Sequence, residues 1–297
     1  MTNYYSEIKN ELINNEIYKK VKDYSKNRSD LNTYYNVGKL LSEAGKHYGE
    51  EIIKKYSIKL TKELGKKYNE TLLKRARQFY VIVEKGAPVA HQLSWSHYIE
   101  LIPLKDVNII NYYINISISQ NLSRNELRRR IKRKEYERLD DKTKDKLIKK
   151  EETNVSDFIK NPIIIKSKNK IDINNVSEKV LKELILENID DFMKELGEGF
   201  AYIGNEYKIK IGNRYHYIDI LLFNIIYNSY VVIELKVTEL KSSYIGQIME
   251  YINYVDRNIK LDSQDKTIGV IIVKKDNKFV MEYVTDRRII SKEYVLR

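Results

Sequence analysis

The stretch YIDILLFNIIYNSYVVIELKV, residues 217–237, contains two strongly apolar runs that are interrupted by three ionisable side chains. Asp219 stands in the first run, and Glu234 and Lys236 stand in the second. Both runs have the length and the β-branched and aromatic content of strands, and residues 224–229 form the turn between them. A carboxylate in an apolar strand is unfavourable unless something compensates its charge. The stretch therefore predicts a β-hairpin that carries a polar site.

Side-chain alternation predicts how this site is arranged. Glu234 and Lys236 share one face of their strand, Leu235 points to the other, and Asp219 can lie opposite Glu234 on the neighbouring strand. The two carboxylates and the main-chain carbonyl of Leu235 would form an oxygen-only site suited to Mg²⁺ or Mn²⁺. Such a site can hydrolyse a phosphodiester, with Lys236 orienting the attacking water. From spacing alone, the alternative is a salt bridge of Glu234 with Lys236 or Asp219.

The surrounding residues predict a compact α/β domain. A helix over 178–196 is followed by Gly197 and Gly199, and a second helix is expected over 242–254. Strand-like runs occupy 200–203, 207–211, 215–223, 230–237 and 268–273. This order of helix, meander of strands, helix and strand predicts a mixed sheet flanked by helices.

The two halves of the chain differ in charge. Residues 1–150 hold 32 Lys and Arg and 19 Asp and Glu, whereas residues 151–297 hold 22 and 23. A basic half beside a near-neutral half indicates that the first half contacts a polyanion, most simply the phosphates of nucleic acid. The alternative is a set of solvated helix faces in a Lys-rich chain.

The first half is predicted to be all-helical, with a helix-turn-helix outline near its centre. Gly65 would end one helix and Asn69 would cap the next, leaving residues 66–68 as the turn. A plain helical hairpin with a basic solvent face is the alternative. In the helix-turn-helix interpretation, four residues at the start of the second helix would reach phosphates and base edges: Lys74, Arg75, Arg77 and Gln78.

A third basic helix is expected over 123–139, where Ser123 and Glu126 have the spacing of a capping box. Its candidate nucleic-acid-binding residues are Arg128, Arg129, Lys132 and Arg133. After Leu139 the composition becomes polar. We therefore expect a helical domain over 1–140, a linker over 141–175 and the α/β domain over 176–297.

The composition also bears on the setting of the protein. The chain has no cysteine, which excludes disulfides and thiolate metal sites. No secretory leader and no sufficiently long apolar segment is apparent, so we expect a soluble, cytoplasmic protein without a membrane partner. No phosphate-binding Gly-rich loop occurs.

Several short motifs resemble the YhcG-type family of PD-(D/E)xK nucleases. In the second half they are GFAYIG at 199–204, YIDILLF at 217–223, VIELK at 232–236, and GQIM and YINY at 246–249 and 251–254. In the first half they are RQFY at 77–80, LSWSHY at 93–98 and YERL at 136–139. The resemblance implies a restriction-endonuclease-like fold behind an all-α domain.

The resemblance also implies roles for individual residues. Asp219 and Glu234 would be metal ligands and Lys236 the catalytic lysine, while Gln247 and Tyr251 look like the Gln-x-x-x-Tyr element of RecB-type nucleases. Glu178 would be a further ligand, because many members of the superfamily place a Glu of the preceding helix at the metal. Several family members carry an acid where this chain has Lys182, so helix capping is the alternative role for Glu178.

Three functional hypotheses follow. The first is a metal-dependent nuclease that hydrolyses phosphodiester bonds, most simply in DNA. The second is a nucleic-acid- or partner-binding protein that retains the nuclease fold as a scaffold. The third is a restriction-system accessory subunit that is inactive alone. Cleavage of both strands of a duplex would require a homodimer.

Overall fold

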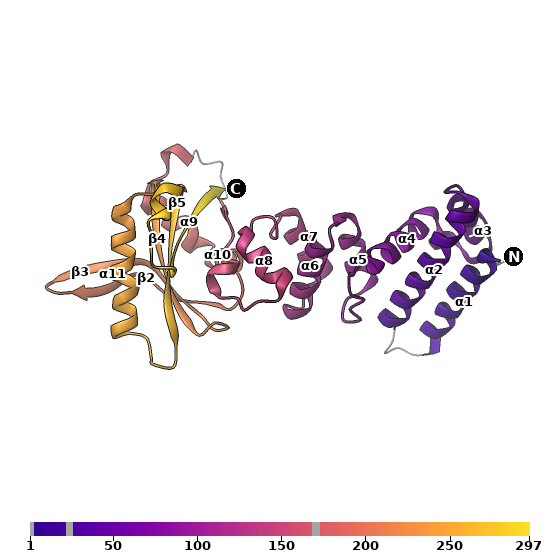
Figure 1. Ribbon diagram of the computed structural model, residues 1–297, viewed down its shortest axis with the longest axis horizontal. Coiled ribbons are helices and arrows are strands. Elements are labelled where there is room, and N and C mark those ends of the chain that lie inside the picture. The colour runs from indigo at the N-terminus through magenta and orange to yellow at the C-terminus, as the bar shows by residue number, and fades with distance from the viewer. Residues whose placement is uncertain (1–2, 22–25, 168–172) are drawn as a thin grey trace. The chain divides into compact units, whose positions relative to one another are not determined.

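The computed structural model describes residues 3–21, 26–167 and 173–297, and it divides into two compact units, Met1–Tyr136 and Glu137–Arg297 (Figure 1). The first unit is helical throughout its described part, as the sequence predicts. Its helices are α1 (Tyr4–Val21), α2 (Lys26–Tyr48), α3 (Ile52–Leu64), α4 (Glu70–Glu84), α5 (Trp95–Leu101), α6 (Val107–Ser119) and α7 (Arg124–Lys132), with short 3-10 turns η2 (Lys66–Tyr68) and η3 (Ile102–Leu104).

The turn between α3 and α4 forms as predicted. Gly65 adopts φ 111°, and its N–H donates to the carbonyl of Thr61. The side chain of Asn69 accepts from the N–H of Leu72 and thereby caps α4. These two local signals explain why both helix boundaries are readable from sequence.

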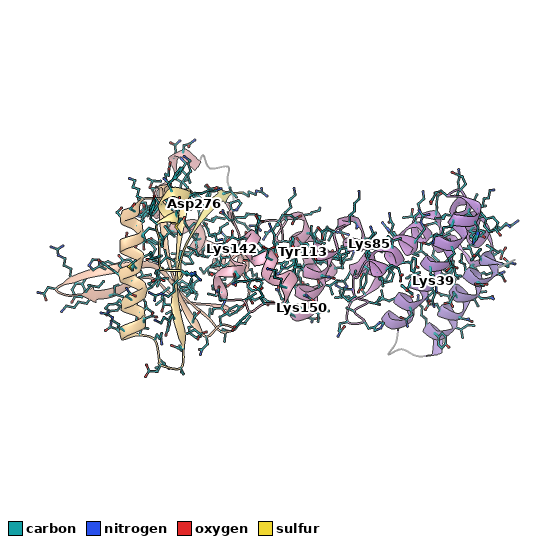
Figure 2. The ribbon with its side chains drawn as sticks, in the orientation of Figure 1. Lys39, Lys85, Tyr113, Lys142, Lys150 and Asp276 are labelled. Carbon is teal, nitrogen blue, oxygen red and sulfur yellow. The ribbon has the colours of Figure 1, made fainter. Side chains whose placement is uncertain are left out.

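Helix α4 also packs very closely on α2. A Cβ atom built on Gly38 of α2 would lie 2.2 Å from the carbonyl oxygen of Ala76 and 2.8 Å from the Cβ of Tyr80. Because the nearest atom belongs to the backbone of α4 and cannot turn away as a flexible side chain could, only glycine permits this approach. Elsewhere in this unit Tyr113 of α6 is fully buried, whereas Lys39 of α2 and Lys85 are exposed (all three are labelled in Figure 2).

The second unit is built around a six-stranded mixed sheet in the order β1-β6-β5-β4-β3-β2. Strands β2, β3 and β4 form an antiparallel meander, whereas β4, β5, β6 and β1 run parallel. The elements are α8 (Asp141–Lys149), η4 (Val155–Phe158), β1 (Ile163–Ile165), η5 (Ile173–Asn175), α9 (Glu178–Glu187), α10 (Ile189–Leu196), β2 (Phe200–Ile211), β3 (Arg214–Asn224), β4 (Ser229–Glu239), α11 (Ser242–Asn258), β5 (Asp265–Lys275), α12 (Lys278–Glu282) and β6 (Ile289–Leu296).

Helices cover both faces of this sheet. Leu181 and Ile185 of α9 and Phe192 of α10 pack on one face, against Ile233 and Leu235 of β4. Helix α11, which connects the parallel strands β4 and β5, packs its apolar stripe on the other face against Val232 of β4. The alternation of β4 thus places Leu235 in one core layer and leaves Glu234 and Lys236 on the α11 side.

Some predicted boundaries are wrong. The expected linker at 141–175 contains α8, η4, β1 and η5, and the compact units meet near residue 136; residues 168–172 of that linker lie outside the described ranges. Ile163–Ile165 joins the sheet through β6, and three residues give too short a pattern to predict a strand. Helix 178–196 is interrupted at Asn188, and strands 200–203 and 207–211 are one strand.

Two further differences have local causes. The third basic helix ends at Lys132 and not near residue 139, because Lys134 adopts φ 53° and leaves the helical region. Strand β6 lacks a distinctive sequence signal, because Lys292 and Glu293 interrupt its apolar residues. None of the described helices is long and apolar enough to cross a membrane.

The β2–β3 hairpin extends past the rest of the sheet. Strand β3 pairs with β4 only from Ile220 to Asn224, whereas its pairing with β2 continues outward to Arg214. Residues 207–218 therefore form a two-stranded segment, here called the ribbon, which projects beyond α11 (Figure 1). Asp219 stands at the point where the ribbon leaves the sheet.

Candidate active site

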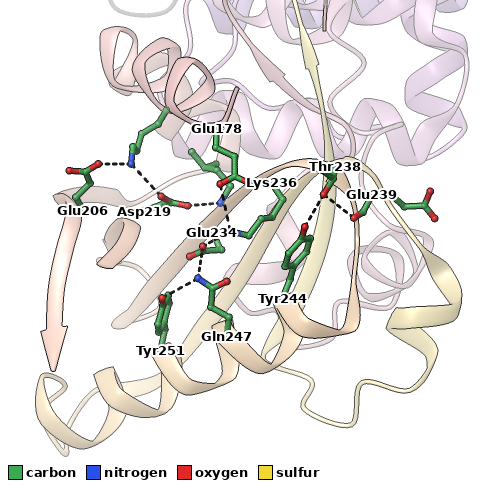
Figure 3. A network of polar contacts seen from close by, with 12 residues as sticks. Glu178, Glu206, Asp219, Glu234, Lys236, Thr238, Glu239, Tyr244, Gln247 and Tyr251 are labelled. Carbon is green, nitrogen blue, oxygen red and sulfur yellow. Dashed lines mark hydrogen bonds and ion pairs between the residues drawn. The ribbon is translucent and has the colours of Figure 1, made fainter. Parts of the chain in front are cut away.

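Asp219 lies where β3 diverges from β4, next to the last paired residue of the two strands. Its Oδ2 accepts a hydrogen bond of 2.9 Å from the N–H of Leu235. Its Oδ1 lies 3.5 Å from the ammonium group of Lys182 on α9, which also binds Glu206 at 2.7 Å (Figure 3). Because β3 and β4 stop pairing here, the N–H of Leu235 donates to the side chain of Asp219 instead of to a carbonyl of β3. This hydrogen bond holds Asp219 beside β4.

Glu234 is the most buried member of the site, with 3% of its surface exposed. Its Oε1 accepts hydrogen bonds from the ammonium group of Lys236 at 2.8 Å and from Nε2 of Gln247 at 2.9 Å. Nε2 of Gln247 also donates to the hydroxyl of Tyr251 at 3.0 Å (Figure 3). The structure therefore brings together Asp219, Glu234, Lys236, Gln247 and Tyr251, which the sequence predicts as one site.

The other carboxylate oxygen of Glu234, Oε2, is buried and makes no hydrogen bond within the described structure. The pKa of Glu234 is raised to about 7: burial has the largest effect, the neighbouring charge of Asp219 acts in the same direction, and the hydrogen bond from Lys236 opposes both. Burial opposes the charge on Lys236, but the hydrogen bond with Glu234 and nearby carboxylates outweigh it and raise its pKa. A second positive charge beside Glu234 would favour its ionised form and so offset the effects of burial and of Asp219.

Glu178 approaches the same group of residues from α9. Its carboxylate lies 3.9 Å from the ammonium group of Lys236, and its side chain is half-exposed at 48%. It is the first residue of α9, after the capping residue Ser177. The position is compatible with both predicted roles, which are to contribute to the site and to stabilise the start of the helix.

The donor set fits a hard divalent cation in part. Asp219 and Glu234 supply carboxylate oxygens, and Oε2 of Glu234 is a buried acceptor that lacks a donor. Within residues 3–21, 26–167 and 173–297, no three acidic or histidine side chains gather closely enough to form a complete metal cage. Two carboxylates with one main-chain carbonyl and water suit Mg²⁺, which commonly keeps several water ligands. The role of the Leu235 carbonyl stays a prediction.

Two further residues at the site, Lys182 and Glu206, were not predicted from the sequence. Lys182 lies one helical turn after Glu178, and this spacing was the signal that could have placed it at the site. Glu206 lies in a β-strand but adopts φ 45°, which no local sequence pattern predicts. Tyr244 is a third neighbour, because its ring lies 5.2 Å from the ammonium group of Lys236.

His97 and His216 make contacts within their own units. His97 makes helix-capping contacts with Ser94, and its other ring nitrogen lies 3.0 Å from the carbonyl of Leu122. His216 packs against the ring of Tyr251 at 6.2 Å, on the α11 side of β3. This contact brings His216 beside a residue of the predicted site, although its odd offset from Asp219 predicts the opposite face of the strand.

The predicted nucleic-acid-binding residues of α4 are partly engaged within the first unit. Lys74 forms an ion pair of 2.6 Å with Glu70, and Arg77 one of 2.5 Å with Glu50. Arg75 is half-buried and Gln78 is exposed. The structure does not test a role of these residues in binding nucleic acid, and the helix-turn-helix interpretation stays a prediction.

The α7 residues divide in the same way. Arg129 and Lys132 are exposed, and Arg133 is half-exposed. Arg128 instead donates two hydrogen bonds to Glu100 of α5, from Nε to Oε2 at 3.0 Å and from Nη2 to Oε1 at 2.8 Å. The Nε of Arg124 lies 2.8 Å from the same group. Arg128 therefore has a structural partner that spacing along the sequence does not reveal.

This arginine clamp predicts an acid-sensitive contribution to stability. The pKa of Glu100 is lowered from 4.5 to about 2, chiefly by the hydrogen bond from Arg128 and also by Arg124, against the opposing effect of burial. A lowered folded-state pKa stabilises the fold above about pH 4.5, and this contribution disappears as the pH falls towards 2. After allowance for the partly exposed arginines, we expect Glu100→Gln to lower the free energy of unfolding by about 1–2 kcal/mol at neutral pH.

Urea unfolding of Glu100→Gln and the parent chain between pH 7 and pH 3.5, followed by circular dichroism, measures this difference. The difference in free energy of unfolding between the two proteins should become smaller below about pH 4.5. Glu70→Gln removes an exposed carboxylate from an ion pair on α4 and serves as the control, with an expected change much smaller than that of Glu100→Gln. A Glu100→Gln effect that is small at pH 7 or widens in acid would contradict the interpretation.

The sheet order and this carboxylate–lysine site define a PD-(D/E)xK nuclease domain. Residues 156–296 match the family model for the YhcG PDDEXK nuclease domain, and residues 9–138 match that for the DUF1016 N-terminal domain. The two matches together cover most of the chain, which thus belongs to the YhcG-type family of PD-(D/E)xK nuclease-domain proteins.

Comparison with individual proteins agrees with this family. Over 183 residues the chain is 26% identical to the Escherichia coli (strain K12) protein named "Putative nuclease YhcG". The aligned region covers 60% of this chain and 48% of that protein. The chain thus spans about half the length of this curated relative. Among solved structures, it resembles a repair endonuclease from Pyrococcus abyssi and an EndoMS-dsDNA2 complex. Each has a TM-score of 0.30 and 18% identity over 44% of this chain, and over 49% and 47% of those chains. These scores are too low to support an argument.

Proposed function

We propose that this protein is a metal-dependent nuclease that hydrolyses phosphodiester bonds in DNA. The observation that carries the proposal is the meeting of Asp219, Glu234 and Lys236 where β3 leaves β4. The family of its second unit supports nuclease chemistry. Asp219 is 21% exposed at its side chain, which gives the site an open side on which a phosphate can approach.

In this proposal Asp219, Glu234 and the Leu235 carbonyl would hold Mg²⁺ or Mn²⁺. The cation, when bound, supplies charge neutralisation and acidifies a water molecule. Gln247 holds Oε1 of Glu234, and Tyr251 restrains Gln247 in turn. Lys236 donates from the same face of β4, so its ammonium group can orient water and balance charge on the scissile phosphate. Glu178 would contribute from α9.

The basic residues of the first unit support DNA as the substrate. The exposed members of the predicted set are Lys74, Gln78, Arg129 and Lys132. Lysine and arginine contacts to phosphates give affinity that falls with salt. A cytoplasmic setting and a homodimer for paired cutting are further parts of the proposal that await measurement.

Removal of divalent cations provides the test. We expect the purified chain to nick or cut supercoiled plasmid DNA with Mg²⁺ or Mn²⁺, and to leave it intact with EDTA, because the carboxylates alone cannot activate water sufficiently. Restoration by excess Mg²⁺ is the control for irreversible damage by the chelator. Cleavage that continues at full rate in EDTA would refute metal dependence.

The two lysines at the site favour a second candidate function. Lys236 pairs with Glu234, and Lys182 lies at ion-pair distance from Asp219. These ammonium groups can neutralise both carboxylates in a scaffold that performs no hydrolysis. In that case the chain would bind nucleic acid or a restriction-system partner and would show no cleavage alone. Cleavage that appears only after addition of a partner would identify an accessory subunit.

A further inference from the structure

The outward face of the ribbon combines two tyrosines with two lysines. Lys208 of β2 pairs in register with Tyr217 of β3, and Lys210 pairs with Tyr215. We call these four residues the Lys–Tyr face. Both lysines are exposed, and Tyr215 and Tyr217 are 56% and 52% exposed. Large aromatic side chains are thus presented to solvent on a projecting two-stranded segment.

The opposite face of the ribbon is anchored to the second unit. Ile209 is buried with the α11 core, and Tyr207 and Ile211 pack against the same cluster. His216 contacts Tyr251 of α11. Burial of one face therefore explains the apolar residues at alternate positions, but it gives no structural reason for the aromatic residues on the other face.

The Lys–Tyr face lies next to the active site along β3. The register between β2 and β3 is regular from Lys210 and Tyr215 to Tyr207 and Ile218. Tyr217 and Tyr215 therefore lie about 7 Å and about 14 Å from Asp219 along β3. Glu206 of β2 and Asp219 share an ion-pair partner, Lys182, beside this segment.

The chemistry of the face suits an unpaired nucleic-acid strand. Lysine ammonium groups attract phosphates, and tyrosine rings stack on bases whose faces are free. In a duplex the base faces are covered by their neighbours, so exposed rings gain little from it. The ammonium group of Lys208 lies 3.9 Å from the ring centroid of Tyr215, which keeps a charge and a ring within reach of one nucleotide.

We propose that the Lys–Tyr face is a binding site for single-stranded nucleic acid that guides an unpaired strand to Asp219. The inference deepens the proposed nuclease function and rests on it for the identity of the site that receives the strand. It specifies substrates with an unpaired segment, such as ends, gaps and flaps. The face binds their phosphates through Lys208 and Lys210 and stacks bases on Tyr215 and Tyr217.

Fluorescence anisotropy in EDTA tests binding without cleavage. The probes are a labelled DNA strand of about 20 nucleotides, longer than a typical single-strand site, and the blunt duplex of the same sequence. With the full chain, Tyr215→Ala/Tyr217→Ala should weaken single-strand binding at least about tenfold and duplex binding less than about twofold. Tyr215→Phe/Tyr217→Phe keeps the rings and should keep the affinity.

The lysines have a separate signature. Lys208→Gln/Lys210→Gln should reduce the slope of log affinity for the single strand against log salt by about 1.4, because each lost phosphate contact contributes about 0.7. Lys266→Gln changes an exposed lysine at the start of β5, away from the ribbon, and should leave the slope unchanged. Circular dichroism of each variant checks folding.

The outcomes separate this inference from the proposed nuclease function. Loss of single-strand binding in the alanine variant, with retention in the phenylalanine variant, supports the Lys–Tyr face whether or not the chain cuts DNA. Equal weakening for strand and duplex, unchanged affinity, or the absence of single-strand binding by the parent chain would overturn it. Cleavage that depends on Asp219 while the ribbon variants bind normally would leave the nuclease function standing alone.

Discussion

Replacement of Lys236 by methionine should reduce DNA cleavage by at least about 100-fold, because this ammonium group is the cation that contacts Glu234 directly. Methionine keeps most of the aliphatic length and removes the charge. Glu234 has an elevated pKa already, so it can take up a proton in the variant and the fold should tolerate the change. Initial rates of plasmid nicking under saturating Mg²⁺ measure the effect.

Lys275→Met is the matched control for this prediction. Lys275 ends β5, the strand beside β4, and forms an exposed ion pair with Glu239. Its loss should leave the cleavage rate within about twofold of the parent, since exposed ion pairs contribute little. Comparable rates for Lys236→Met and the parent chain would remove Lys236 from the catalytic group and favour the scaffold hypothesis.

Gly38→Ala should destabilise the first unit by roughly 2–3 kcal/mol, because the added methyl group would overlap the backbone of Ala76. Alanine is about 1 kcal/mol better than glycine in a helix, and this gain offsets only part of the cost of separating α2 from α4. The side chain has no flexible neighbour at the nearest contact, so the helices themselves must move. Urea unfolding of the full chain, monitored through the helical signal, measures the loss.

Gly45→Ala supplies the comparison within the same helix. A Cβ atom at Gly45 would lie 3.6 Å from Nη1 of Arg77, which is an ordinary contact with a flexible side chain. This variant should be neutral or more stable by up to about 1 kcal/mol. If Gly38→Ala were as stable as Gly45→Ala, the close approach of α2 and α4 would be wrong.

The carboxylate–lysine cluster is predictable from the sequence because its position depends on regular side-chain alternation in the strands. Once residues 217–237 form a hairpin, the shared face of Glu234 and Lys236 and the proximity of Asp219 follow from strand geometry. The same rule predicts His216 on the face opposite to Asp219, but His216 contacts Tyr251 of the site. The family resemblance predicts Gln247 and Tyr251, and their spacing on one helix face lets Gln247 bond both Glu234 and Tyr251.

The rest of the site depends on contacts between residues distant in sequence. Lys182 reaches Asp219 and Glu206 because α9 packs over the sheet, and Glu206 adopts a left-handed conformation within a strand. Neither the packing of α9 nor the left-handed conformation of Glu206 can be predicted from the spacing of residues along the sequence. In the first unit, the sequence predicts that Arg128 binds phosphates, but the fold brings Glu100 of α5 within ion-pair distance of its guanidinium group. Edge strand β1 was missed because three residues carry too little pattern.

The central claim is that Asp219 and Glu234 together hold one hard divalent cation. Isothermal titration of the metal-free chain with Mn²⁺, beside Asp219→Asn and the control Asp265→Asn at the exposed start of β5, tests it most directly. We predict one Mn²⁺ site per chain in the parent and in Asp265→Asn, and at least about tenfold weaker binding in Asp219→Asn. Equal Mn²⁺ affinity in all three proteins, or no binding by the parent chain, would contradict the account.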